Sequence, residues 1–138
     1  MDGDQALRAK IKIEHRLPFV QIVIWYKGQR LLLEKVLVDT GSASTILKLD
    51  LIEEIGITAE ETDIVGSISG VGGSEYVFLK KIDCIEIAGV NVKDVIVDVG
   101  AMNYGIDIHG IIGTDLLLKI NGVINLKDLV LESNLGEA

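Results

Sequence analysis

The sequence predicts an all-β fold. Of the 138 residues, 49% are hydrophobic but only 4% are aromatic, and Ile, Val and Leu supply most of the apolar content. Branched apolar side chains fit a pleated, half-buried surface better than a helix interior. Fifteen glycines against one proline indicate many tight turns. At this length we expect residues 1–138 to form one compact domain.

Several segments alternate apolar and polar residues with a period of two, as half-buried strands do. Lys27-Gly28-Gln29 and Ala88-Gly89-Val90-Asn91 are turn sequences, and they predict hairpins between the strands that flank them. The segments before residue 10 and after residue 131 lack such a pattern, so we expect them to be poorly ordered. The predicted strands cover residues 10–14, 18–26, 30–38, 62–69, 74–87, 92–99, 123–126 and 129–131.

Two short helices are expected among these strands. Apolar residues recur at helical spacing over residues 46–55, and Gly56 is placed to end that helix. A second helix is predicted over residues 115–120, with Thr114 as its N-cap. Residues 100–110 show neither period, and we expect them to be irregular.

Composition also limits the classes of partner. The formal net charge of −8 argues against binding to nucleic acid or to an anionic membrane. The apolar runs are too short to cross a bilayer, and the polar first residues do not resemble a signal peptide. The single cysteine, Cys84, excludes an internal disulfide and fits a reducing compartment. We therefore expect a cytoplasmic protein.

The two histidines, His15 and His109, do not combine with acidic residues at the spacing of a metal site. We accordingly predict no metal and no cofactor. Taken alone, His109 is typical of an ordinary exposed or hydrogen-bonded histidine.

The residue that most needs a chemical explanation is Asp39. It ends the apolar run Val36-Leu37-Val38 and begins the sequence Asp39-Thr40-Gly41-Ser42. A carboxylate at the inner end of a buried strand is costly to desolvate unless hydrogen bonds or a shared proton compensate it. Two other glycine-containing segments accompany it, residues 69–74 and Ile111-Ile112-Gly113 before the second helix.

With these three segments in this order, the chain resembles the retropepsin-like aspartic proteases, the family of retroviral proteases and their cellular and prokaryotic relatives. The resemblance covers roughly residues 19–118. It implies a closed, barrel-like β fold with a flap hairpin and one short helix in the C-terminal half. It also implies an endopeptidase in which two carboxylates share a proton and activate water.

The resemblance assigns roles to residues around the single Asp-Thr-Gly. Asp39 is the catalytic residue, and a homodimer must supply its second copy because Gly113-Thr114-Asp115 has the wrong order for a second motif. Thr40 reaches across to the other copy, Gly41 lets the backbone approach the carboxylate, and Ser42 bonds its outer oxygen. Peptide or protein chains are the implied substrates.

Two further groups of site residues follow from the resemblance. The flap, with Val71 at its tip, consists of Ser69, Gly70, Val71, Gly72 and Gly73. An ordinary glycine-rich hairpin is the alternative reading of that segment. The pocket wall and the support beneath the catalytic loop consist of Ile108, His109, Ile111, Ile112 and Gly113. An apolar cleft of this kind predicts hydrophobic substrate side chains.

Some positions depart from the retroviral pattern. Ala43 and Ser44 stand where retroviral enzymes carry acids that grip the substrate backbone, and Thr114 replaces a frequent arginine. The tail is also longer, so a dimer sheet built from terminal strands is not assumed. A different class of function remains open on these grounds, a catalytically inactive dimer that binds peptides or acts as a scaffold.

Overall fold

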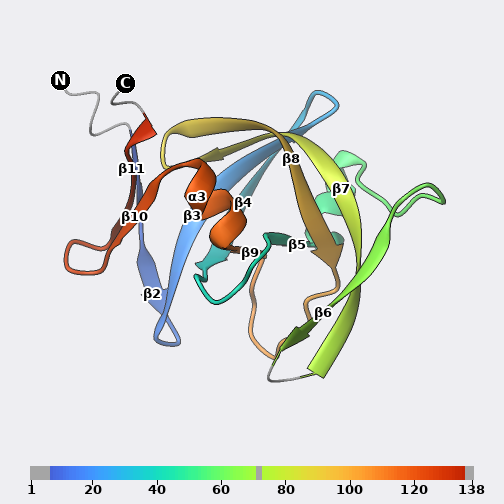
Figure 1. Cartoon of the computed structure of the whole chain (residues 1–138), viewed down its shortest axis with the longest axis horizontal. Helices are drawn as coiled ribbons and strands as arrows, with labels where there is room; N and C mark the ends of the chain where they lie inside the picture. Colours follow the sequence, from blue (N-terminus) through green and yellow to red (C-terminus); the bar gives the residue numbers. More distant parts are fainter. Residues whose placement is uncertain (1–6, 71–72, 136–138) are drawn as a thin grey trace.

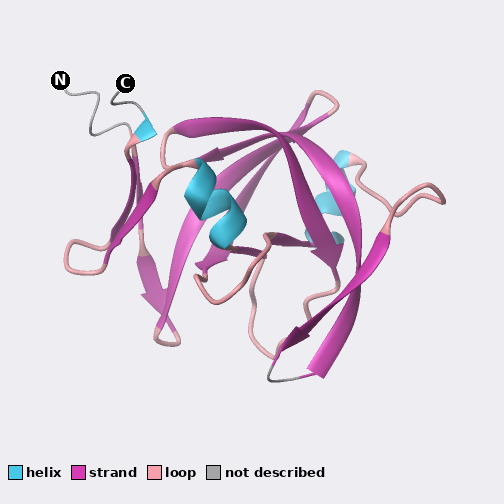
Figure 2. Cartoon of the chain, viewed as in Figure 1, coloured by secondary structure: helices cyan, strands magenta, loops and turns pink. Residues whose placement is uncertain are grey.

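The structure, a computed structural model, describes residues 7–70 and 73–135. These residues are mostly in strands, as predicted (Figure 2). The helical elements are α2 (Leu49–Ile52), the 3₁₀ turn η1 (Glu53–Ile55) and α3 (Thr114–Lys119). The strands are β1 (Arg8–Lys10), β2 (Lys12–Glu14), β3 (Leu17–Tyr26), β4 (Gln29–Val38), β5 (Ile46–Lys48), β6 (Val65–Gly70), β7 (Gly73–Ile87), β8 (Val90–Gly100), β9 (Gly110–Ile112), β10 (Gly122–Asn125) and β11 (Val130–Ser133).

Six strands close into a ring, which confirms the expected barrel-like fold. Going round the ring, the order is β3-β4-β9-β5-β8-β7, and β7 pairs back onto β3 through Ile24 and Ile85. Strands β2 and β6 continue the sheet beyond this ring. Most neighbours are antiparallel, but β4 with β9 and β5 with β8 are parallel. The parallel pairs bring segments that are far apart in the sequence to the end of β4.

Two apolar clusters fill the molecule. The larger lies within the barrel, where the side chains of Ile24, Leu33, Ile82 and Ile85 are fully buried. The smaller cluster includes Leu37, two residues before Asp39, and it consists of Phe19, Leu37, Ile46, Val77, Met102 and Ile108. The smaller cluster thus packs beneath the end of β4, where the candidate functional residues begin.

Residues 8–9 and 132–133 are more ordered than the sequence suggested, while residues 1–6 and 136–138 lie outside the described residues. Strands β1 and β10 pair with opposite edges of β11, which makes a separate three-stranded sheet (Figure 1). Arg8 stands opposite Glu132, and their side chains form an ion pair at 3.2 Å. The predicted disorder is therefore wrong for residues 8–9 and 132–133. Ile11 also interrupts the predicted first strand, because its N–H donates to Leu129 O at 2.8 Å.

The predicted helix over residues 46–55 is correct only in its second half. Ile46 and Leu47 are almost completely buried and pair with β8 on one side and β9 on the other, so the sheet takes them as β5. Helix formation starts at Leu49, and Gly56 ends it with φ of +89°, as predicted. None of the helices in residues 7–70 and 73–135 has the length and apolar character needed to cross a membrane.

Candidate active site

Asp39 directly follows β4 and is half-buried. Its N–H donates to Ile112 O at 3.0 Å, and its carbonyl accepts from Ser42 N–H at 3.1 Å, which closes a tight turn. The N–H of Gly41 donates to the Asp39 carboxylate, with 2.9 Å between N and Oδ1. A Cβ at position 41 would lie 3.1 Å from that oxygen, closer than side chains normally approach. The backbone therefore approaches this carboxylate closely at a position where glycine avoids a steric conflict.

Thr114 makes two hydrogen bonds to the turn that follows β4. Its hydroxyl donates to Thr40 O at 3.0 Å, and its N–H donates to Ser42 O at 2.8 Å. The prediction that Thr114 caps its own helix is therefore wrong: Gly113 is the N-cap of α3, without a side-chain cap bond. In the single chain the Ser42 hydroxyl donates to Ser44 O at 2.8 Å rather than to the Asp39 carboxylate that the resemblance implied, and Thr40 is exposed.

The segment Ile111-Ile112-Gly113 runs beside the turn. Ile111 and Ile112 pair in parallel with the last residues of β4, and Ile111 also pairs with Ile46 of β5. Gly113 then crosses directly against the turn, because a Cβ there would lie 2.5 Å from Ser44 O. At that distance from backbone atoms, glycine is the residue that fits.

Two residues that sequence reasoning missed tie the far end of the turn to α3. Thr45 is fully buried, and its hydroxyl donates to Asp115 Oδ1 at 2.9 Å, while its N–H donates to Oδ2 at 3.1 Å. The same hydroxyl accepts from Gly113 N–H at 3.2 Å, and Leu116 N–H donates to Asp115 at 2.7 Å. The only signal in the sequence was a hydroxyl placed directly before the buried pair Ile46-Leu47.

The turn opens onto a cleft with a volume of about 720 Å³. The turn, the β6–β7 hairpin and β9 all contribute to its wall, so three of the predicted segments come together there. The lining residues are Asp39, Gly41, Ser42, Ala43, Ser44, Ile46, Ile68, Ser69, Ser74, Glu75, Ala101, Asn103, Tyr104 and Ile111.

The β6–β7 hairpin projects beyond the barrel, and its free end lies near the 101–109 loop (Figure 1). Gly70 pairs with Gly73, and the Ser69 and Ser74 hydroxyl oxygens are 3.1 Å apart. Val71 and Gly72, the expected tip of the flap, lie outside the described residues. The described residues of the hairpin thus border the cleft.

Ile108 and His109 do not reach the cleft in the single chain. Ile108 is buried in the smaller apolar cluster. The backbone N–H of His109 donates to Lys35 O at 2.8 Å, and its Nδ1 accepts from Lys35 N–H at 3.2 Å, so this residue holds the backbone of β4. Ile111 is the one expected pocket-wall residue that lines the cleft.

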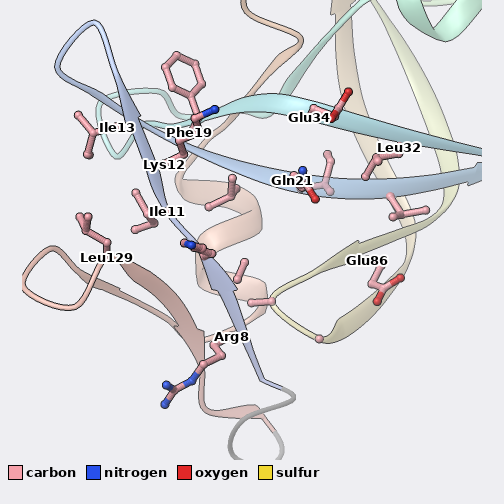
Figure 3. A pocket seen from close by; sticks show the side chains of 17 residues that line it. Arg8, Ile11, Lys12, Ile13, Phe19, Gln21, Leu32, Glu34, Glu86 and Leu129 are labelled. Atoms are coloured by element: carbon pink, nitrogen blue, oxygen red, sulfur yellow. The ribbon is translucent and has the colours of Figure 1, made fainter.

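A second hollow, with a volume of about 780 Å³, lies between the N-terminal strands and the end of β7 (Figure 3). Arg8 and Lys12 stand on one side of it, and Glu86 stands on another. None of the predicted site residues lines this hollow. Within residues 7–70 and 73–135, no group of three His, Cys, Asp or Glu residues is arranged to hold a metal ion. The candidate site is therefore the cleft at Asp39.

Replacing Gly113 with alanine tests the crossing beneath the turn. Because the new methyl group would meet backbone atoms of Ser42 and Ser44, Gly113→Ala should lower the free energy of unfolding by about 1–3 kcal/mol. Urea unfolding measures this. Gly66→Ala is the matched control, since its Cβ would meet Val77 at an ordinary 3.9 Å, and we expect a change below about 1 kcal/mol. Equal stability of the Gly113→Ala variant and the parent would contradict the crossing.

Comparison with known proteins agrees with the geometry. A family model described as aspartyl protease matches residues 22–116, from β3 to the first turn of α3. A search of curated proteins found no match. The matched segment covers more than half of the chain and contains the turn at Asp39, the hairpin and β9. The chain therefore belongs to the retropepsin-like aspartyl protease family.

Proposed function

We propose that the protein is an aspartic endopeptidase that acts as a homodimer on peptide or protein chains. The observation that carries the proposal is the Asp39 carboxylate, which is held by Gly41 N–H and opens onto a cleft large enough for a peptide. The family supports a protease-like function, whereas the catalytic residue and the dimer are part of the proposal. The proposal also includes a reducing, cytoplasmic location, which rests on the single cysteine, Cys84.

Two copies of Asp39 supply the acid and the base that peptide hydrolysis needs. Carboxylates at hydrogen-bond distance cannot both ionise, so they share one proton. The ionised carboxylate takes a proton from a water molecule, and the water oxygen attacks the peptide carbonyl carbon. The protonated carboxylate gives its proton to the carbonyl oxygen. When the tetrahedral intermediate breaks its C–N bond, a proton passes to the leaving amine and the dyad returns to its starting state.

The surface beside Thr40 supports the proposed dimer. A hollow of about 400 Å³ lies there between the turn, α3 and β10. Leu118 of α3 is 70% exposed and lines it. Strand β10 is an edge strand of the sheet β1-β11-β10, so its outer edge has no neighbour among the described strands. A two-fold contact could form through this apolar face and open strand edge. It would bring the turns of both copies together at the two-fold axis of the dimer.

The rival function, a dimer that binds peptides without cleaving them, is favoured by one observation. The Ser44 hydroxyl stands where a substrate-gripping acid is expected, and it donates to Asp98 Oδ2 at 2.6 Å. The Ser44 hydroxyl proton is therefore already used in a hydrogen bond within the chain. Peptide binding without turnover from acidic to neutral pH would support the rival.

Asp39→Asn tests catalysis directly. Loss of the group that exchanges protons with water should lower the rate of peptide-library cleavage by about 10²-fold or more, as measured by mass spectrometry. Asp94→Asn, at an exposed position on β8, is the control and should cleave like the parent. An Asp39→Asn protein that cleaves as fast as the parent would refute the proposal.

Leu118→Glu tests the proposed dimer surface. A charge on this exposed apolar side chain would have to be buried on association, so the variant should be monomeric in sedimentation experiments and should lose activity in parallel. Ile96→Glu is the control, because Ile96 is similarly exposed, at 59%, but lies on β8 away from α3. If Leu118→Glu remained dimeric and active, the dimer would have to form through another surface.

A further inference from the structure

Glu75 lines the cleft but has no role in the proposed reaction. It lies two residues after Gly73 in β7 and pairs with Ile68 of β6, so both side chains reach the cleft from the same hairpin. Besides Glu75, the titratable lining residues are Asp39 and Tyr104. None of the lining residues is Lys, Arg or His. The wall of the cleft therefore carries negative charge without a compensating cation.

The Glu75 carboxylate is held in a fixed orientation. The hydroxyl of Tyr104 donates to Oε1, and the N–H of Met102 donates to Oε2 at 3.3 Å. The carboxylate also packs over the end of β8, since a Cβ at Gly100 would lie 3.0 Å from Oε2. The loop after β8 thus fixes the position of the Glu75 carboxylate, while β7 fixes its backbone.

Both donors are neutral, so they orient the carboxylate without cancelling its charge. Burial raises the pKa of Tyr104, and the hydrogen bond to Glu75 and the negative charge of that carboxylate raise it further. The phenol therefore remains protonated and keeps donating. An ionised carboxylate offers about four acceptor positions, and two of those on Glu75 are used within the chain.

Among the described residues, three other half-buried carboxylates have cations beside them, whereas Asp39, Glu86, Asp98 and Asp115 are half-buried without one. Glu14 lies 3.3 Å from the Lys35 ammonium, and Asp63 lies 3.1 Å from that of Lys80. Glu132 is paired with Arg8 in the same way. Within the described residues Glu75 has no such ion pair. A bound substrate with a basic side chain could supply the positive charge that the lining residues of this chain do not provide.

We propose that Glu75 and Tyr104 form a subsite for a basic substrate side chain, Arg or Lys, on one side of the scissile bond. This inference rests on the proposed function of the cleft as a peptide site. The substrate cation would pair with the free acceptor positions of Glu75, and the ring of Tyr104, which is 44% exposed, offers a face for a guanidinium. The apolar stem of the side chain would lie along Ile68.

This subsite narrows the hydrophobic preference that the sequence suggested. Ile46, Ile68 and Ile111 do provide apolar surface in the cleft. The fixed carboxylate at its edge adds a requirement for charge at one position, because an ion pair that is partly shielded from water discriminates between charged and neutral side chains.

Paired peptides that differ only in arginine or citrulline test the subsite, since citrulline has the same shape without the charge. The arginine is moved through each position of a cleaved sequence, and kcat/KM is measured for every pair. At one position the parent protein should prefer arginine by about tenfold, which corresponds to about 1.4 kcal/mol. Glu75→Gln should abolish this preference, so that the arginine and citrulline peptides of each pair are cleaved with equal kcat/KM.

Two further variants make the result specific. Tyr104→Phe removes one donor but leaves the charge, so part of the preference should remain. Glu86→Gln changes a carboxylate on the same strand outside the cleft and should leave the preference intact. If the parent and the Glu75→Gln variant show the same arginine-to-citrulline ratio, or if neither ratio departs from one at any position, the subsite is wrong.

A binding measurement separates this inference from the proposed function. Fluorescence anisotropy with the Asp39→Asn protein reports peptide affinity without turnover, and arginine peptides should bind about tenfold more tightly than citrulline peptides only when Glu75 is present. If the parent shows this preference in binding but cleaves no peptide, the protease proposal fails and the subsite stands. Equal binding of both peptides would overturn the subsite, even for an active protease.

Discussion

The structure depends on one crossing, at which the backbone of Gly113 passes against the turn that follows β4. Hydrogen bonds on either side of this crossing fix both ends of the turn. Ile112 O accepts from Asp39 N–H at the first end, and Asp115 accepts from Thr45 at the other. The position of the carboxylate is therefore set by residues about seventy positions further along the chain. A side chain at position 113 would separate the two segments.

The sequence allowed the site motif to be predicted because its signals are local. Asp39-Thr40-Gly41-Ser42 after an apolar run, glycines at the hairpin end and the Ile-Ile-Gly segment each have a physical reason that can be read within a few residues. The closed barrel was implied by the family resemblance that these segments carry. Gly56 ends its helix in the left-handed conformation, which the local sequence was enough to predict.

The features that escaped prediction all depend on distant contacts. Ile46 to Lys48 has a helical pattern, but two neighbouring strands pair with it on both sides and override that preference. The pairing of β1 with β11 joins the two ends of the chain, for which no local period exists. Similarly, no pattern around Glu75 or Tyr104 indicates that a carboxylate and a phenol 29 residues apart meet at the cleft.

One chain provides only part of what peptide hydrolysis by two carboxylates requires. A single chain holds one carboxylate in place, shapes a cleft beside it and orients a second acidic side chain at the edge. Peptide hydrolysis by this chemistry needs another carboxylate next to the first, and the apolar face of α3 with the open edge of β10 offers the surface through which a second copy would bring it. Dimer formation would then be required for catalysis.

The most direct measurement is a crystal structure of the assembled protein, in which the distance between the two Asp39 carboxylates is read. The account predicts a two-fold dimer with carboxylate oxygens about 3 Å apart, within hydrogen-bond range. A monomer, or a dimer that leaves the two aspartates far beyond hydrogen-bond range, would contradict it.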